Sequence, residues 1–137
     1  MKLKIFLIGN KLPQRFIVGL TEGDLIYSAR YKYEDDDPNG EEIPHSRIAR
    51  EHGLDLTPGK VDVFGGGNVT SRENGILRLD GVSGKYGAVP FRALSLLSTE
   101  ILDEYMKMVP EIRGLDLPGR DEWVKPWVWE EMSRLKI

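Results

Sequence analysis

The pattern of apolar and polar positions predicts β-strands in the first quarter of the chain. Three segments are rich in β-branched and aromatic residues: 3–8, 16–20 and 25–33. Such segments are typical of strands, and residues 21–24 between the second and the third predict a hairpin turn. Alternation places Leu3, Ile5 and Leu7 on one face of the first strand. Because both faces are apolar further along, we expect this strand to be covered on both sides.

Lys4 lies on the opposite face of this first strand, among apolar neighbours. A partly buried ammonium group costs free energy unless an anionic group meets it. The long side chain can instead carry the charge out to solvent at the end of the strand. The sequence leaves both arrangements open.

Apolar residues that recur at steps of three and four predict the longest helix at 94–109. Its apolar stripe consists of Ile101, Leu102, Tyr105, Met106 and Val109. Ser98 or Thr99 is expected to cap the start of this helix, and Pro110 ends it. We interpret the stripe as core.

A last helix is predicted to begin at Pro126, because proline suits the first helical turn. The helix carries Trp127, Trp129 and Met132, and Trp123 precedes it. This apolar load favours docking onto the body of the domain. A homodimer or partner surface at the tryptophan-rich C-terminus is the alternative.

A short helix is predicted at 44–52, with Ile48 and Ala49 on its buried stripe. His45 lies at the N-terminal end, where the helix dipole disfavours protonation. His52 lies at the C-terminal end, where the charged form and a capping role are favoured. Since a neutral imidazole can attack or accept a proton, His45 is the better catalytic candidate, and a structural histidine is the alternative.

Two short β-rich runs, 61–64 and 76–80, each lead into a glycine-rich segment. The first segment is the triple glycine 65–67 followed by Asn68, and the second spans 81–87. Because glycine raises the entropy cost of folding and permits close approach to the main chain, we interpret both as loops whose N–H groups form an anion nest. Plain hairpin turns are the alternative, since the standard phosphate-loop and dinucleotide motifs are absent.

The composition is that of one soluble domain with a single core. The chain has 137 residues, of which 40% are hydrophobic and 30% charged. The net charge of −3 argues against a nucleic-acid partner, and the absence of cysteine excludes disulfides and thiolate metal sites. The apolar start is too short to span a membrane, so we expect no membrane partner and a cytoplasmic location.

The acidic segment 34–42 partly matches a calcium-binding loop. The residues at positions one, three, five and six of such a loop are Asp35, Asp37, Asn39 and Gly40. Ser46 stands at position twelve, where a bidentate glutamate is required, and Pro38 interrupts the loop. A solvated loop is the favoured interpretation, with weak binding of a divalent cation as the alternative.

These motifs, in this order, resemble the Janus/ocnus family of protein phosphohistidine phosphatases. The matching pieces are the strand at 4–8, residues 31–33, His45, the runs 65–70 and 81–87, and residues 98–100. The resemblance implies an α+β fold in which a mixed β-sheet is flanked by helices. It covers residues 1–110 as a phosphatase-like domain, with 111–137 as a C-terminal helical extension packed on the same domain.

The resemblance also implies a function, which is hydrolysis of phosphohistidine in a protein without a metal or other cofactor. His45 would be the nucleophile or general base, and Lys4 would neutralise phosphate charge. The other implied phosphate-binding residues are Gly67, Asn68, Ser83, Gly84 and Lys85. The implied partner is a phosphorylated protein or a small phosphorylated ligand.

The chain departs from the family pattern at Asn68, where members usually carry an arginine that grips the phosphate. Asparagine donates hydrogen bonds but brings no charge, and Lys85 is the candidate replacement. Arg30 lies one position away from a family basic residue, so strand alternation is expected to turn it to the wrong side of the sheet. The alternative function is therefore a binding module that holds a phosphorylated ligand without catalysis.

Overall fold

In the part of the chain that the structure describes, six strands form one mixed sheet in the order β1-β3-β2-β4-β5-β6. The computed structural model describes residues 1–31, 45–54 and 62–137. The strands are β1 (Leu3–Ile8), β2 (Arg15–Thr21), β3 (Asp24–Arg30), β4 (Val63–Ser71), β5 (Ile76–Asp80) and β6 (Gly114–Asp116). The helices are α1 (His45–Glu51), α2 (Phe91–Met108) and α3 (Pro126–Leu135), with short 3-10 turns at Glu73–Gly75 and Asp121–Trp123. The predicted α+β class is confirmed.

This sheet is antiparallel in the middle and parallel at both edges. The outer pairs β1–β3 and β5–β6 are parallel, whereas β2 pairs antiparallel with both β3 and β4. The predicted hairpin between β2 and β3 is confirmed, and Glu22 and Gly23 at its tip both have positive φ, as a two-residue primed turn requires. No helix within the described ranges has the length and apolar character needed to cross a membrane.

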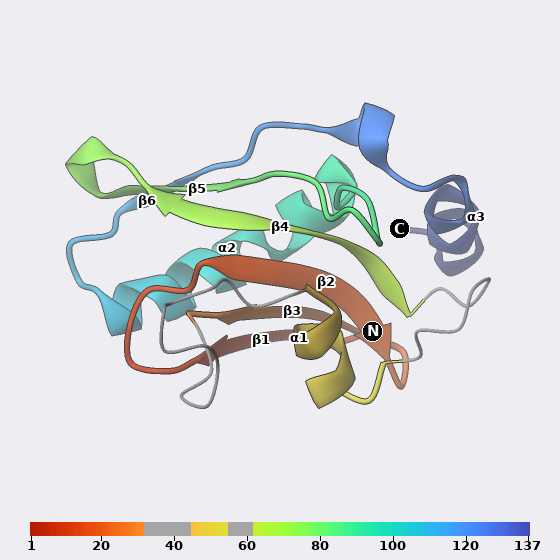
Figure 1. The fold of residues 1–137 in the computed structure, drawn as a ribbon, viewed down its shortest axis with the longest axis horizontal. Helices are drawn as coiled ribbons and strands as arrows, with labels where there is room; N and C mark the ends of the chain where they lie inside the picture. The colour runs from red at the N-terminus through yellow and green to blue at the C-terminus, as the bar shows by residue number, and fades with distance from the viewer. Residues whose placement is uncertain (32–44, 55–61) are drawn as a thin grey trace.

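The two faces of the sheet are covered by different helices (Figure 1). On one face, α2 packs over the larger core, which includes Phe16, Val18 and Tyr27. On the other face, α1 packs over a smaller cluster, which includes Ile17 and Ile26. Leu3, Ile5 and Leu7 contact the first core and Phe6 contacts the second, so the expectation that the first strand is covered on both sides is confirmed.

Helix α2 begins earlier than the sequence predicts, at Phe91. The Phe91 N–H donates to Oδ1 of Asp121, 2.9 Å away, so the cap comes from a residue thirty positions further along. Ser98 lies inside the helix, and its hydroxyl donates to the carbonyl of Ser95. The stripe is also shifted, because Met106 is 42% exposed. The buried positions are Ala93, Leu94, Leu97, Ile101 and Tyr105.

The segment 111–137 joins the same sheet and the same core. It supplies β6 and the buried side chains of Val128 and Met132 on α3, which begins at Pro126 as predicted. The face of α3 that packs on the domain carries no tryptophan, because Trp127 and Trp129 are both partly exposed, as is Trp123 before the helix. Trp123, Trp127 and Trp129 are 59%, 44% and 39% exposed. The homodimer surface, which was the alternative to docking, stays a prediction. The predicted solvated loop at 34–42, with weak cation binding as its alternative, lies outside the described residues.

A buried pair of tyrosines ties the sheet to α2. The hydroxyl groups of Tyr27 on β3 and Tyr105 on α2 are 2.7 Å apart, and both residues are fully buried. Burial raises the pKa of both phenols, and so they remain neutral.

Removing one hydroxyl group of this pair should lower the free energy of unfolding more than removing both. We expect Tyr105→Phe to lower the free energy of unfolding by about 1–3 kcal/mol, because the Tyr27 hydroxyl is left buried without a partner. The double variant with Tyr27→Phe should recover most of that loss. Urea unfolding of the wild type, both single variants and the double variant measures the effect, and strictly additive losses would contradict it.

Candidate functional site

His45, the first residue of α1, is held against the sheet by an oriented hydrogen bond. Its Nε2 lies 2.8 Å from the carbonyl oxygen of Gly67, and the residue is only 8% exposed. A carbonyl oxygen has no hydrogen to give, so Nε2–H is the donor. The bond therefore fixes both the ring orientation and the tautomer, and it leaves the lone pair on Nδ1.

The triple glycine is part of a strand, so the prediction of a first glycine loop is wrong. Gly65, Gly66 and Gly67 are buried inside β4, and they pair with β2. A Cβ atom on Gly66 would lie 2.6 Å from Cδ2 of His45, closer than real Cβ contacts come. The missing side chain at this position gives the imidazole room to lie close to the main chain of the sheet.

Neighbours also crowd the other two glycines. A Cβ atom at Gly65 would lie 2.4 Å from the main chain of Ala88, and one at Gly67 would lie 2.6 Å from the ring of Phe16. The prediction that these glycines form a loop whose main-chain N–H groups bind an anion is therefore wrong, because the glycines are packed. They allow close packing of β4 against groups on both faces.

The surroundings of His45 keep its imidazole neutral. Burial lowers its pKa below the usual value, the bond to the Gly67 carbonyl opposes this, and the nearby charge of Arg15 lowers the pKa further. His52 behaves differently from the expectation of a charged cap. Its Nε2 lies 2.7 Å from the hydroxyl oxygen of Ser28, and burial lowers its pKa as well.

Two arginines lie on the same face of the sheet as His45. Arg30 and Arg15 are direct cross-strand neighbours, and Arg15 in turn stands opposite Asn68 of β4. The Nε of Arg30 lies 3.5 Å from a carboxylate oxygen of Glu51 on α1, so Arg30 faces α1 rather than the wrong side. The sequence reasoning missed Arg15. If the residue pairs of the β2–β3 hairpin are counted outward from its two-residue turn, Arg15 falls opposite Arg30, so the sequence contained the signal for Arg15.

The second glycine segment does form a tight loop, centred on Ser83. Main-chain bonds in both directions between Ser83 and Gly87 close the loop, and Ser83 is buried. The hydroxyl oxygen of Ser83 accepts bonds from the N–H groups of Lys85 at 3.3 Å and Tyr86 at 3.2 Å. The serine oxygen thus occupies the position that an anion would take on those two N–H groups.

His45 and this loop share one neighbour, Gly66. The Gly66 N–H donates to the Gly87 carbonyl at 3.1 Å, while the His45 ring covers Gly66. Tyr86 packs against the apolar cluster of α1, and the ammonium group of Lys85 lies 5.6 Å from the centre of the Tyr86 ring. A Cβ at Gly84 would meet nothing within 4 Å, so the tip of the loop is open.

Lys4 is the one predicted site residue that stands apart. Its ammonium group forms an ion pair with Asp24 at 2.9 Å, and its side chain is 45% exposed. Its strand, β1, is separated from β4 by β3 and β2, a distance of roughly 14 Å at the usual strand spacing. The structure therefore brings together His45, Gly67, Asn68 and the Ser83 loop, without Lys4. Within the described ranges, no group of three or more His, Asp or Glu side chains could hold a metal ion.

The fold and the site together define a small α+β domain with one buried histidine beside two arginines. No family model matches the chain, and no curated protein matches it. The resemblance to the phosphohistidine phosphatases thus rests on the motifs quoted above and stays a prediction.

Adding a methyl group at Gly66 should displace the His45 ring. We expect Gly66→Ala to lower the free energy of unfolding by about 1–3 kcal/mol, because the new atom overlaps the imidazole. Gly84→Ala is the matched control and should change little, since its site is open. Urea unfolding and the NMR signals of the His45 ring measure the effect. Equal behaviour of the two variants would contradict the packing described here.

The lowered pKa values predict a protein that is less stable in mild acid. The pKa of both histidines is lower in the folded state than the usual 6.5 of an unfolded chain. Each histidine therefore contributes stability that is fully present above about pH 6.5 and is lost as the pH falls from there through the lowered pKa. We expect the free energy of unfolding to decrease from about pH 7.5 to about pH 5.5. His45→Gln should reduce this dependence, and His52→Gln is the comparison variant. A pH dependence unchanged in both variants would refute the assignment.

Proposed function

We propose that this protein hydrolyses phosphoryl groups carried on nitrogen, in the manner of a metal-independent protein phosphohistidine phosphatase. The observation that carries the proposal is the state of His45. It is buried, its pKa is lowered, and its Nε2–H is committed to the Gly67 carbonyl, so a basic Nδ1 remains.

The chemistry that follows uses this Nδ1 in one of two ways. As a nucleophile it bonds to phosphorus while the P–N bond of the substrate breaks, and water later hydrolyses the phosphorylated His45. As a general base it takes a proton from the water that attacks phosphorus, and the departing nitrogen picks up a proton. In both cases His45 must begin neutral.

Positive charge that could meet the phosphoryl oxygens lies on the neighbouring strands β2 and β3. Arg15 stands beside Asn68 across the β2–β4 pair, next to the position where the resembling family carries its arginine. We propose that Arg15, with Arg30 behind it, takes over that role, since a guanidinium group can bind two phosphate oxygens at once. The Ser83 hydroxyl and Lys85 would contact the remaining oxygens.

Asn68 favours one alternative, a module that binds a phosphorylated protein or small phosphorylated ligand without hydrolysing it. Asparagine supplies hydrogen bonds but no charge at the position nearest the Gly67 carbonyl. In that case the same groups would bind phosphate, and His45 would only support the sheet.

The variant His45→Ala distinguishes the two functions. Under the phosphatase proposal, it should reduce hydrolysis of a phosphohistidine peptide by at least about a hundredfold, because the attacking or proton-accepting group is lost. Phosphate affinity, measured by calorimetry, should change much less. Arg15→Gln should instead weaken phosphate binding.

Two controls make the result clear. His52→Ala removes the other histidine, which bonds to Ser28, and should leave hydrolysis nearly unchanged. If the wild type binds phosphate but shows no hydrolysis above background, the binding module is supported. Full hydrolysis by His45→Ala would refute the catalytic assignment.

A further inference from the structure

The strand β1 forms one edge of the sheet and carries hydrogen-bonding groups that point outward. Within the described residues it pairs only with β3. The Leu25 N–H of β3 donates to the Lys2 carbonyl, and in a parallel pair every second residue bonds to the partner strand. The main-chain groups of Leu3, Ile5 and Leu7 therefore face away from β3, where a further strand could pair with them.

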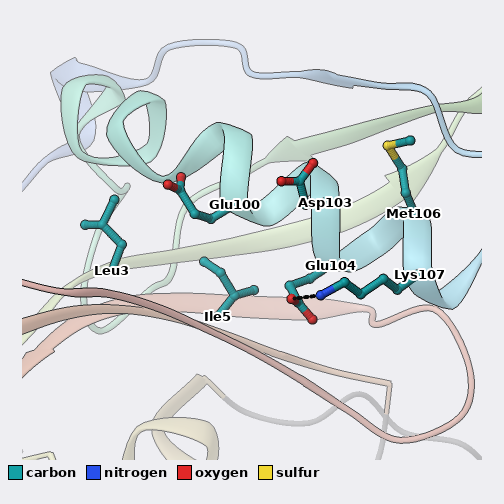
Figure 2. Close-up of a pocket in the computed structure, with 7 residues that line it drawn as sticks. All are labelled: Leu3, Ile5, Glu100, Asp103, Glu104, Met106 and Lys107. Carbon is teal, nitrogen blue, oxygen red and sulfur yellow. Dashed lines mark hydrogen bonds and ion pairs between the residues drawn. The ribbon is translucent and has the colours of Figure 1, made fainter.

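A groove runs beside this edge, between β1 and α2. Its volume is about 520 Å³. It is lined by Leu3, Ile5, Glu100, Asp103, Glu104, Met106 and Lys107, as Figure 2 shows. Leu3 and Ile5 form an apolar floor from the strand, and the acidic side chains line the groove from the helix. The outward main-chain groups and the groove thus lie along the same strand.

The groove has a net negative charge. Lys107 neutralises Glu104 in an ion pair at 2.8 Å, but neither Glu100 nor Asp103 takes part in a salt bridge within the part of the chain that the structure describes. The nearest cation on β1, Lys4, points to the opposite face and is paired with Asp24. An occupant of this groove should therefore be basic.

We propose that the β1 edge binds an extended, basic segment of a partner protein as a seventh strand. Main-chain bonds to Leu3, Ile5 and Leu7 would supply affinity. Alternate side chains of the bound segment would lie over the groove, where the alkyl stems of lysine or arginine cover Leu3 and Ile5 and their charged ends reach Glu100 and Asp103. This site is distinct from the histidine site, since α1 and α2 cover opposite faces.

Charge also argues against a second copy of this chain as the occupant. Pairing of two β1 strands about a two-fold axis would bring both copies of α2 to the same side of the joined sheet. Glu100 and Asp103 of each copy would then face those of the other, and like charges at short range are unfavourable.

The test uses a labelled ten-residue peptide in which lysine alternates with valine or threonine, with a glutamate-for-lysine peptide for comparison. We expect the full-length protein to bind the lysine peptide and not the glutamate peptide. On binding, the amide hydrogens of Leu3, Ile5 and Leu7 should exchange more slowly, as measured by NMR. The Phe6 amide, which faces β3, serves as the internal reference.

Three variants locate the binding. The double variant Glu100→Lys, Asp103→Lys should lower the affinity for the lysine peptide by about tenfold or more, because two attractive charges become repulsive. Glu130→Lys on α3 makes the same kind of charge change away from the groove and should have no effect. Ile5→Pro removes an outward N–H without breaking the bonds to β3, and should also weaken binding.

The outcomes separate the alternatives. Equal binding of both peptides, no binding, or binding that survives the Glu100 and Asp103 substitutions would refute the proposal. A protein that sediments as a dimer and becomes monomeric in Ile5→Pro would show that a second copy occupies the edge. Because the charge substitutions lie on an exposed helix surface, they remain informative even if Ile5→Pro does not fold.

Discussion

The contact between the His45 ring and the bare main chain of Gly66 is the constraint on which the candidate site depends. Without a side chain at Gly66, the imidazole lies close enough to the sheet for its Nε2–H to reach the next carbonyl, at Gly67. The same closeness removes water from the ring, which lowers its pKa. One missing side chain thus sets the burial, the tautomer and the protonation state of the histidine.

The neighbouring glycines extend this effect to the rest of β4. Gly65 admits the main chain at Ala88, and the Gly66 N–H bonds to Gly87, so the Ser83 loop runs directly along the strand. The residues of β4 thus determine which groups lie next to the strand, with the His45 ring over Gly66 and the Ser83 loop beside its main chain. The row from Arg30 through Arg15 to Asn68 lies on the same face as His45.

Local signals predicted the elements well and their roles less well. Three local features could be predicted from the sequence. They are the alternation in β1, the turn at Glu22 and Gly23, and the start of α3 at Pro126. The triple glycine was misread because entropy and propensity argue for a loop, whereas close packing from both faces decides for a strand. That packing depends on residues distant in sequence, such as Phe16 and Ala88.

Long-range partners explain the remaining differences. Burial overrides the helix dipole at His52, and the buried face of α3 is formed by Val128 and Met132 rather than by the tryptophans. The charge near Asn68 comes from Arg15 on the neighbouring strand, so reading along the chain from the glycines does not reveal it. The candidate site was therefore predictable in its histidine and its loop, and not in its cations.

The cap of α2 has a consequence for the order of events during biosynthesis. The Phe91 N–H is satisfied by the carboxylate of Asp121, which the ribosome adds thirty residues later. Until then the first turn of this helix has an open end exposed to water. Tyr27 and Tyr105, which tie α2 to the sheet, are both made before Asp121, so this helix can reach the sheet before its first turn is capped.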